Sequence, residues 1–298
     1  MKVKDTFSTC HPLVNFYYFT LVIVFAMFFL HPVLLPISLC IAVTYSIYLN
    51  GYKSVRFIVF AMLPTLLLAS AINPMFSHAG VTILFYLDNG NPITLESIVY
   101  GVAVGGMLIT VIIWFSCYNA VMTSDKFIYL FGRIIPALSL ILSMVLRFVP
   151  RFKAQIKEIS NAQKCIGRDV SSGNILMRVR NGLTILSILI TWALENAIET
   201  ADSMKSRGYG LKGRTAFSIY QFDSRDKRLL LVFIICTVFI CLGIYQRVTV
   251  ITFFPSIMIQ PYSYFHLIVY SAYTIFLCTP MILNITEDMK WKSIQSNT

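Results

Sequence analysis

The sequence predicts an all-α fold: a polytopic membrane helical bundle with a cytoplasmic domain of long amphipathic helices. Of the 298 residues, 57% are hydrophobic and only 12% are charged, and the mean hydropathy is +0.74. Soluble domains carry about 25% charged residues, and disordered chains are poor in aromatic and aliphatic residues. The composition therefore excludes a soluble globular domain and a disordered chain.

Six apolar stretches are each long enough to cross a bilayer, which takes about 20 residues. None of them contains Lys, Arg, Asp or Glu, whereas charges inside a membrane usually mark a proton or ion path. The first stretch lacks the small-residue cleavage site of a signal peptide, so we expect a retained helix. The six predicted membrane helices are Leu13–Leu30, Val33–Leu49, Phe57–Ile72, Ile98–Met122, Leu229–Tyr245 and Tyr264–Leu283.

Basic residues concentrate between the fourth and fifth stretches. The segment Asp125–Arg228 holds 17 of the 24 Lys and Arg and 8 of the 13 Asp and Glu, so it carries nine of the eleven net positive charges. By the positive-inside bias this segment is cytoplasmic. When the membrane crossings are counted in both directions from this segment, both termini are predicted to be cytoplasmic, and Pro74–Thr94 is predicted to lie outside the cell. The chain then divides into membrane helices 1–4 (residues 1–122), a cytoplasmic domain (123–228), and membrane helices 5–6 with a tail (229–298).

Small residues and prolines fall inside several of the apolar stretches. Gly101 and Gly105 stand one helical turn apart, a spacing that lets a neighbouring helix backbone approach closely. Helix packing is the preferred interpretation, and a kink that lines a substrate path is the alternative. Pro36 and Pro64 are expected to kink their helices, which neighbouring helices can tolerate by satisfying the freed carbonyls.

The cytoplasmic segment alternates amphipathic and apolar helical patterns. Its run from Leu138 to Leu146 repeats apolar residues at the i, i+3, i+4 and i+7 spacing of a buried helix face. Polar residues interrupt each pattern too often for a lipid-facing span, so we expect basic-rimmed helices at the membrane surface or packed beneath the bundle. The predicted helices are Asp125–Gly132, Ile134–Phe148, Arg151–Ile166, Asn174–Arg180 and Leu183–Arg207.

Two of these helices end in a similar way. One ends in Cys-Ile-Gly-Arg (165–168) and the other in Ser-Arg-Gly (206–208). In each, a glycine stands where a left-handed residue closes a helix, and a basic side chain complements the negative end of the helix dipole. Arg207 would then point outward from a helix tip, either as a solvated cap residue or as a docking group.

The second of these ends resembles a known family signature. Ala201–Gly210, preceded by Glu195 and Glu199, is similar to the second Ala-Arg-Gly signature of the T component of energy-coupling factor (ECF) transporters, the EcfT/CbiQ family. The order and spacing match over roughly Thr123–Phe217. The apolar stretches on both sides agree with the family's layout, so the resemblance covers nearly the whole chain.

The first end resembles the same family with one departure. Leu146–Pro150, followed by Ala162 and Gln163, is similar to the lead-in to the first signature. Where the family carries an arginine before the glycine, this chain has Ile166, and Arg168 follows the glycine. In that family the two signature helix ends insert into grooves on two cytoplasmic ATPases. The departure suggests a hypothesis: if the two ATPases are different proteins, one groove is more apolar and accepts Ile166.

The resemblance implies a non-catalytic coupling subunit of an ABC-type importer in the bacterial or archaeal cell membrane, with residues 123–228 as its coupling domain. In that family the subunit joins a membrane-embedded, substrate-binding S component to two cytoplasmic ABC ATPase subunits. ATP hydrolysis moves the coupling helices and reorients the S component, which releases a vitamin or metal ion inside. The residues implied in ATPase docking are Cys165, Ile166, Gly167, Arg168, Ser206, Arg207 and Gly208, and those that support the coupling helices are Ala162, Gln163, Glu195, Glu199, Ala201 and Asp202.

The sequence lacks several motifs that mark enzymes. The P-loop, H-E-x-x-H and G-x-S-x-G patterns are absent, so ATP hydrolysis is expected on the partners. Glu195, Glu199 and Asp202 share one helix face, where paired carboxylates could do acid/base work. The nearby Lys205 and Arg207 favour a salt-bridged face instead.

No cofactor, metal site or nucleic-acid partner is expected, because the seven Cys form no C-x-x-C pair, the four His are scattered and no nucleic-acid-binding motif occurs. The excess of basic residues instead suits topology and contact with anionic lipid in the bilayer. A stand-alone secondary transporter is the main alternative. It would show internal repeats and broken helices with polar groups at the membrane midplane.

Overall fold

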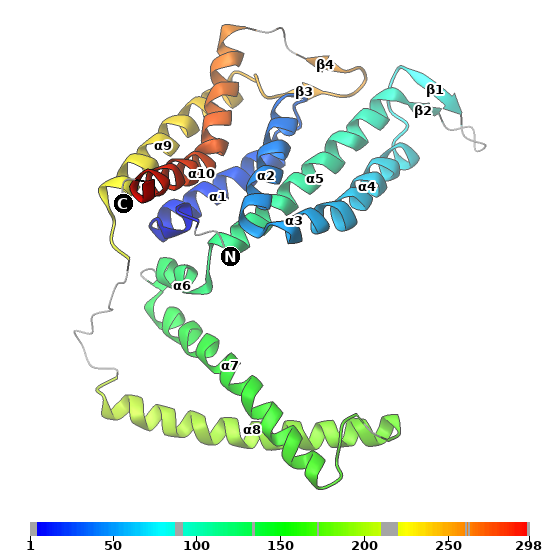
Figure 1. Ribbon diagram of the computed structural model, residues 1–298. Coiled ribbons are helices and arrows are strands. Elements are labelled where there is room, and N and C mark those ends of the chain that lie inside the picture. Colours follow the sequence, from blue (N-terminus) through cyan, green and yellow to red (C-terminus); the bar gives the residue numbers. More distant parts are fainter. Residues whose placement is uncertain are drawn as a thin grey trace. The chain divides into compact units, whose positions relative to one another are not determined.

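The computed structural model describes residues 5–86, 92–132, 135–171, 173–209, 220–259, 261 and 263–296. Contacts divide the chain into two compact units. The first unit combines Met1–Phe127 with Tyr220–Thr298, and the second is Ile128–Ile219. Helices dominate both units, which confirms the predicted all-α class (Figure 1).

The first unit is a helical bundle. A 3-10 turn, Phe7–Thr9, precedes α1, and a π-helical segment, Ile58–Met62, joins α3 to α4. The helix α5 packs against α1, α2 and α4, and α10 packs against α2 and α9. The helices are α1 (Pro12–Phe28), α2 (Leu34–Asn50), α3 (Tyr52–Phe57), α4 (Leu63–Phe76), α5 (Leu95–Val121), α9 (Ser224–Tyr245) and α10 (Tyr264–Ser296).

Two short antiparallel hairpins lie at one end of this bundle. The strand β1 (Ile83–Tyr86) pairs with β2 (Pro92–Thr94), and β3 (Ile251–Thr252) pairs with β4 (Met258–Ile259). Both hairpins lie at the end of the bundle opposite the two chain termini (Figure 1). The strands form only at helix connections, where the chain must turn back.

Aromatic side chains fill the core of the first unit. Tyr18 is fully buried, and its ring lies 5.2 Å from Phe233, 5.3 Å from Phe276 and 6.2 Å from Trp114, measured between centroids. Rings at these separations attract one another beyond their burial of area. The Trp114 indole donates to Ser38 Oγ at 3.1 Å, so its buried polar atom is satisfied. The core therefore ties together α1, α2, α5, α9 and α10.

Five described helices are long and apolar enough to cross a membrane. Four of them coincide with predicted crossings, and the 17-residue helices α1 and α2 lie at the two other predicted positions. The remaining helix, Ile175–Ser206, meets the same criteria of length and hydropathy but lies in the segment predicted to be cytoplasmic. That cytoplasmic location stays a prediction. The chain is a multi-pass membrane protein whose five long apolar helices are Tyr52–Phe76, Leu95–Val121, Ile175–Ser206, Ser224–Tyr245 and Tyr264–Gln295.

Two long helices form most of the second unit. The short helix α6 (Ser124–Gly132) leads into it, and α7 (Pro136–Cys165) and α8 (Ile175–Ser206) follow. Figure 1 shows α7 crossing α8, and the two helices contact each other.

The continuity of α7 and α8 corrects the prediction of four shorter helices. The sequence pattern divided at Pro150 and near Gly182, yet both residues lie inside continuous helices. Pro150 removes one backbone hydrogen bond, which the remaining turns of a 30-residue helix outweigh. A helical glycine costs about 1 kcal/mol relative to alanine, which is too little to end a helix of 32 residues.

The two prolines predicted to kink their helices both lie in the first turn of a helix. Pro36 lies in the first turn of α2, between the Leu35 amide, which donates to His31 O, and the Ile37 amide, which donates to Val33 O, so its missing N–H interrupts the backbone bonds only at the start of the helix. Pro64 lies in the first turn of α4, directly after the π-helical segment Ile58–Met62. The irregular backbone that we expected at Pro64 therefore precedes it.

The glycines of α5 allow α4 to approach closely. A Cβ built on Gly101 would lie 2.7 Å from the Ser70 carbonyl oxygen, and one built on Gly105 would lie 3.3 Å from the Leu66 carbonyl oxygen. The Asn73 side chain donates to the Ser97 carbonyl at 3.2 Å across the same contact. The absence of a side chain at Gly101 and at Gly105 is thus what lets the two backbones approach closely.

We expect Gly101→Ala to lower the thermal unfolding temperature of the detergent-purified protein. The added methyl group would overlap Ser70 O, and overpacking of this kind costs about 1–3 kcal/mol. Gly182→Ala is the matched control, since Gly182 is also helical but a Cβ there meets nothing within 4 Å. It should be neutral or stabilise by up to about 1 kcal/mol. Equal losses in the two variants would contradict the close-approach interpretation.

Candidate functional site

The C-terminus of α7 is closed by a left-handed glycine. Ile166 caps the helix, and Gly167 follows with φ of +79°. The Gly167 amide donates to Lys164 O at 3.0 Å, and the Arg168 amide donates to Gln163 O at 2.9 Å. These two bonds form the Schellman pattern, which satisfies carbonyls that a helix end otherwise leaves open.

The C-terminus of α8 has the same backbone. Arg207 caps the helix, and Gly208 follows with φ of +79°. The Gly208 amide donates to Lys205 O at 3.0 Å, and the Tyr209 amide donates to Met204 O at 3.0 Å. The left-handed glycines predicted at both helix ends are therefore confirmed.

The two ends present different side chains from one backbone geometry. Ile166 is 64% exposed, and Arg207, at the equivalent position, is exposed as well. Cys165 and Ser206, which precede them, are also exposed. One tip thus offers an aliphatic group and the other a guanidinium, whose planar fork suits carboxylate partners. We call Cys165–Arg168 the first tip and Ser206–Gly208 the second tip.

The structure does not bring the two tips together. The first tip leads through residues 169–174 into the start of α8, and the second tip follows the end of α8. Because α8 has 32 residues and a helix rises about 1.5 Å per residue, the tips are separated by roughly 48 Å along it.

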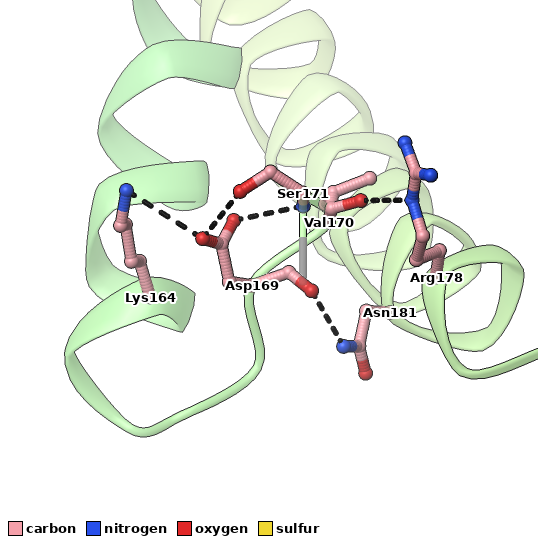
Figure 2. Close-up of polar contacts among 6 residues, drawn as sticks. All are labelled: Lys164, Asp169, Val170, Ser171, Arg178 and Asn181. Carbon is pink, nitrogen blue, oxygen red and sulfur yellow. Dashed lines mark hydrogen bonds and ion pairs between the residues drawn. The ribbon is translucent and has the colours of Figure 1, made fainter. Parts of the chain in front are cut away.

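A polar network anchors the chain that follows the first tip, as Figure 2 shows. Asp169 Oδ1 accepts from the Ser171 amide at 3.0 Å, and Oδ2 accepts from the Ser171 hydroxyl at 2.6 Å. Lys164 Nζ, in the last turn of α7, lies 3.5 Å from Asp169 Oδ2. Asn181, on α8, donates to the Asp169 carbonyl at 2.9 Å. Asp169 thus connects α7, the turn and α8.

A second bond fixes the same turn to α8. Arg178 Nε donates to the Val170 carbonyl at 2.8 Å (Figure 2). The consecutive carbonyls of Asp169 and Val170 therefore accept hydrogen bonds from Asn181 and Arg178, which lie about one helical turn apart on α8. The direction in which the first tip leaves α7 is set by contacts on both helices.

Hydrogen bonds from Ser171 lower the pKa of the Asp169 carboxyl, and the Lys164 charge lowers it further. A lowered pKa means that the folded state favours the charged carboxylate. The stability that this network adds to the folded state is therefore fully present above the ordinary pKa of 3.8. It is lost as the pH falls through the folded-state pKa.

An aromatic cluster joins α7 to α8 where they cross. The Phe152 ring lies 5.8 Å from the Trp192 ring, edge to face, and stacks on Phe148 at 5.9 Å. The Arg151 guanidinium lies 5.4 Å from the centre of the Trp192 ring, within cation–π range. Sequence analysis missed this cluster, although the aromatic pair spaced i, i+4 around Pro150 was a visible signal.

The predicted support residues lie on the two long helices. Gln163 contributes its backbone carbonyl to the first closed end, and Ala162 is exposed on α7. The others, on α8, are all exposed: Glu195, Glu199, Ala201 and Asp202.

The salt-bridged face predicted on α8 is wrong. Within the described residues, the three carboxylates of that face form no ion pair with Lys205 or Arg207, and the ion pairs present are Lys164–Asp169 and Lys290–Glu287. Pairs between exposed side chains gain little free energy in water, because fixing two long side chains costs entropy. The described residues also contain no cluster of three or more His, Cys, Asp or Glu side chains that could hold a metal ion.

We expect Asp169→Ala to speed amide hydrogen exchange across residues 166–174 by about tenfold, because it removes two hydrogen bonds to Ser171. Asp202→Ala is the matched control, an exposed carboxylate on α8 outside this network. Exchange measured by mass spectrometry on peptides from the purified protein tests the pair. Unchanged exchange in Asp169→Ala would show that the network does not order the turn.

Comparison with known proteins places this arrangement in a family. Residues 8–219 match the family model CbiQ, described as cobalt transport protein. The energy-coupling factor transporter transmembrane protein EcfT of Lactococcus lactis subsp. cremoris is 38% identical over 106 residues, which are 35% of this chain and 40% of that protein. The EcfT protein of Lactobacillus helveticus is 35% identical over 99 residues, or 33% of this chain and 36% of that protein.

A longer match extends this similarity. The EcfT protein of Acidaminococcus fermentans is 30% identical over 187 residues, which are 56% of this chain and 70% of that protein. The chain thus spans less than half the length of the first two relatives and more than two thirds of the third. The family match covers most of the chain and includes both closed helix ends. The chain therefore belongs to the CbiQ family, in agreement with its resemblance to the EcfT/CbiQ transmembrane components.

Proposed function

We propose that this chain is the coupling subunit of an energy-coupling factor transporter, in which the second unit transmits the motion of two cytoplasmic ATPase subunits to a membrane-embedded S component. One observation carries the proposal: two long helices end in the same glycine-closed turn, each with an exposed cap side chain. A side chain on a closed helix end is held more firmly than one on a loop, so it can pass on a displacement. The names of the EcfT relatives support the assignment.

The separation of the tips supports two partners rather than one. A standard protein interface buries about 800 Å² per partner, which is a patch roughly 30 Å across. The separation of the tips, roughly 48 Å along α8, is larger than the width of such a patch. Each tip would therefore dock into its own ATPase subunit.

The different side chains of the tips suggest two different grooves. An arginine fork pairs best with carboxylates, so the groove for Arg207 would be acidic. The exposed Ile166 would bury its side chain in an apolar groove, which gains about 1.5–3 kcal/mol for a residue of this size. We therefore propose that the two ATPases are different proteins.

The proposed orientation follows the charge distribution. The basic excess of residues 125–228 supports a cytoplasmic location of the two tips and of both chain termini. The apolar stretches carry no Lys, Arg, Asp or Glu, which suits a subunit whose cargo, a vitamin or metal ion, binds on the S component.

We expect Arg207→Glu to release one ATPase subunit from the complex purified in mild detergent. Reversing the charge of a group that docks into an acidic groove costs about 2–5 kcal/mol, so the affinity for that ATPase subunit should fall by at least about thirtyfold. Arg180→Glu is the matched control, because Arg180 is an exposed arginine near the other end of α8. Retention of both ATPases in Arg207→Glu would contradict docking at the second tip.

Ile166→Arg tests the first tip separately. If its groove is apolar, a buried guanidinium without a carboxylate partner weakens binding, and the other ATPase is lost instead. Quantitative mass spectrometry of the purified complex distinguishes the two subunits. Loss of the same subunit in both variants would contradict one tip per ATPase.

Reconstitution separates this proposal from a stand-alone secondary transporter. A secondary transporter would accumulate substrate in vesicles on an ion gradient without partners. The coupling subunit alone is expected to transport nothing, and uptake should require ATP and the partner subunits. Gradient-driven uptake by the purified chain alone would overturn the proposal.

A further inference from the structure

The chain just before α1 forms a compact turn at the end of the first unit. Residues 5–11 include the 3-10 turn Phe7–Thr9, closed by hydrogen bonds from the Ser8 amide to Asp5 O and from the Cys10 amide to Phe7 O. The Phe7 side chain is fully buried and lies 5.2 Å from the Tyr18 ring. We call residues 5–11 the N-terminal clasp.

Side chains of α2 and α10 hold the clasp from the bundle side. Asn284, on α10, donates to Asp5 Oδ1 at 2.6 Å and accepts from the Thr6 amide at 2.8 Å and the Phe7 amide at 3.3 Å. The Tyr45 hydroxyl, on α2, donates to Asp5 Oδ2 at 3.4 Å. Asp5 and Asn284 are 8% and 1% exposed. The clasp is therefore integrated into the bundle.

A buried lysine joins the clasp to the chain that leaves for the second unit. Lys126, in the first turn of α6, is only 6% exposed. Its ammonium donates to the Ser8 carbonyl and, at 3.0 Å, to the Val121 carbonyl at the end of α5. With the Asn15 amide turned so that both its atoms are satisfied, Asn15 Oδ1 accepts a third bond from Lys126 at 3.1 Å.

Three acceptors match the three protons of an ammonium group. Burial lowers the pKa of Lys126, and the nearby Asp5 carboxylate opposes that effect. Burying an ammonium is costly unless its hydrogen bonds are all made. The side chain therefore has one geometry that satisfies it, and in that geometry the start of α6 is fixed to the clasp, to α1 and to α5.

The chain that returns from the second unit meets the same turn. Arg225, in the first turn of α9, donates from Nη2 to Thr9 Oγ1 at 3.1 Å. The Phe222 ring lies 5.0 Å from the His11 ring, edge to face. A capping box between Asp223 and Asp226 begins α9 at this point.

Both connections to the second unit are thus bound by one short segment. The unit boundaries fall after Phe127 and before Tyr220. Lys126 precedes the first boundary by one residue, and Phe222 and Arg225 follow the second within a few residues. Neighbouring acceptors of the clasp, Ser8 O and Thr9 Oγ1, receive the two basic side chains.

We infer that the N-terminal clasp, through Lys126 and Arg225, is a positioning element that holds the two connections of the second unit at a fixed spacing on the bundle. Lys126 is its central positioning residue. Without it, movement of the second unit would be absorbed by bending at residues 121–128 instead of reaching the bundle. This mechanical role rests on the proposed coupling function, whereas the local order that the clasp imposes does not.

The experiment compares Lys126→Met with Lys227→Met, which removes an exposed lysine in the first turn of α9. In the full chain purified in detergent, amide exchange of residues 122–128 should rise by about tenfold in Lys126→Met only. In vesicles with the partner subunits, substrate uptake per ATP hydrolysed should fall by about fivefold. Complex assembly and ATP hydrolysis should be retained.

Two outcomes would overturn the inference. Unchanged exchange of residues 122–128 would show that Lys126 does not order the connection, and a proportional loss of uptake and ATP hydrolysis would show a general structural role. If Lys126→Met does not accumulate, Thr9→Val replaces it, since it removes the hydroxyl that accepts from Arg225 and donates to Thr6 O. That variant should raise exchange at residues 220–226, and unchanged exchange there would equally overturn the inference.

Failure of the clasp and failure of the proposed function give different results. If the wild-type chain recruits no ATPase subunits, the coupling function fails, and the exchange comparison still decides the clasp in the isolated chain. If the ATPases assemble and Lys126→Met transports with the wild-type uptake per ATP, the clasp has no mechanical role and the coupling function stands.

Discussion

The closure of helix ends is the constraint on which the second unit depends. A helix leaves its last carbonyls without donors, and a residue with positive φ lets its own amide and the next one turn back to two of them. Gly167 and Gly208 meet this need with the same φ of +79°. Because the backbone itself makes these bonds, the cap side chains of Ile166 and Arg207 are not used in closing the helix. The fold thus separates the part that holds a tip from the part that a partner would recognise.

Local patterns of the sequence predicted much of this arrangement. The apolar stretches marked the membrane helices because backbone groups in a bilayer must be satisfied within each helix. Glycine after a basic amphipathic run marked both closed ends, since few other residues adopt a left-handed conformation at low cost. The i, i+4 spacing of Gly101 and Gly105 indicated where another helix could approach. Each of these signals lies within a few residues of the feature that it predicts.

Features that depend on distant residues could not be predicted in this way. Phe152, two residues after Pro150 on α7, packs against Trp192, forty positions away on α8. The turn after the first tip is ordered by Asn181, twelve residues beyond Asp169. In the sequence, Lys126 is one of many basic residues in a segment predicted to be cytoplasmic, and only the fold shows that it is buried against Ser8, 118 positions away. A count of charges cannot separate such a lysine from the solvated ones.

Hydrogen bonds of two different kinds fix the ends of the second unit. At the tips, bonds within the backbone leave the side chains free to differ, and the two tips do differ in chemistry while sharing a geometry. At the connections, the bonds come from the side chains of Lys126 and Arg225 to one turn, so side-chain identity itself is constrained. The proposed coupling role would require both properties, because the tips would have to fit their partners and the connections would have to resist bending. The stability of the fold should therefore tolerate substitution better at the two cap positions than at Lys126 and Arg225, and the glycines are the exception that the backbone imposes.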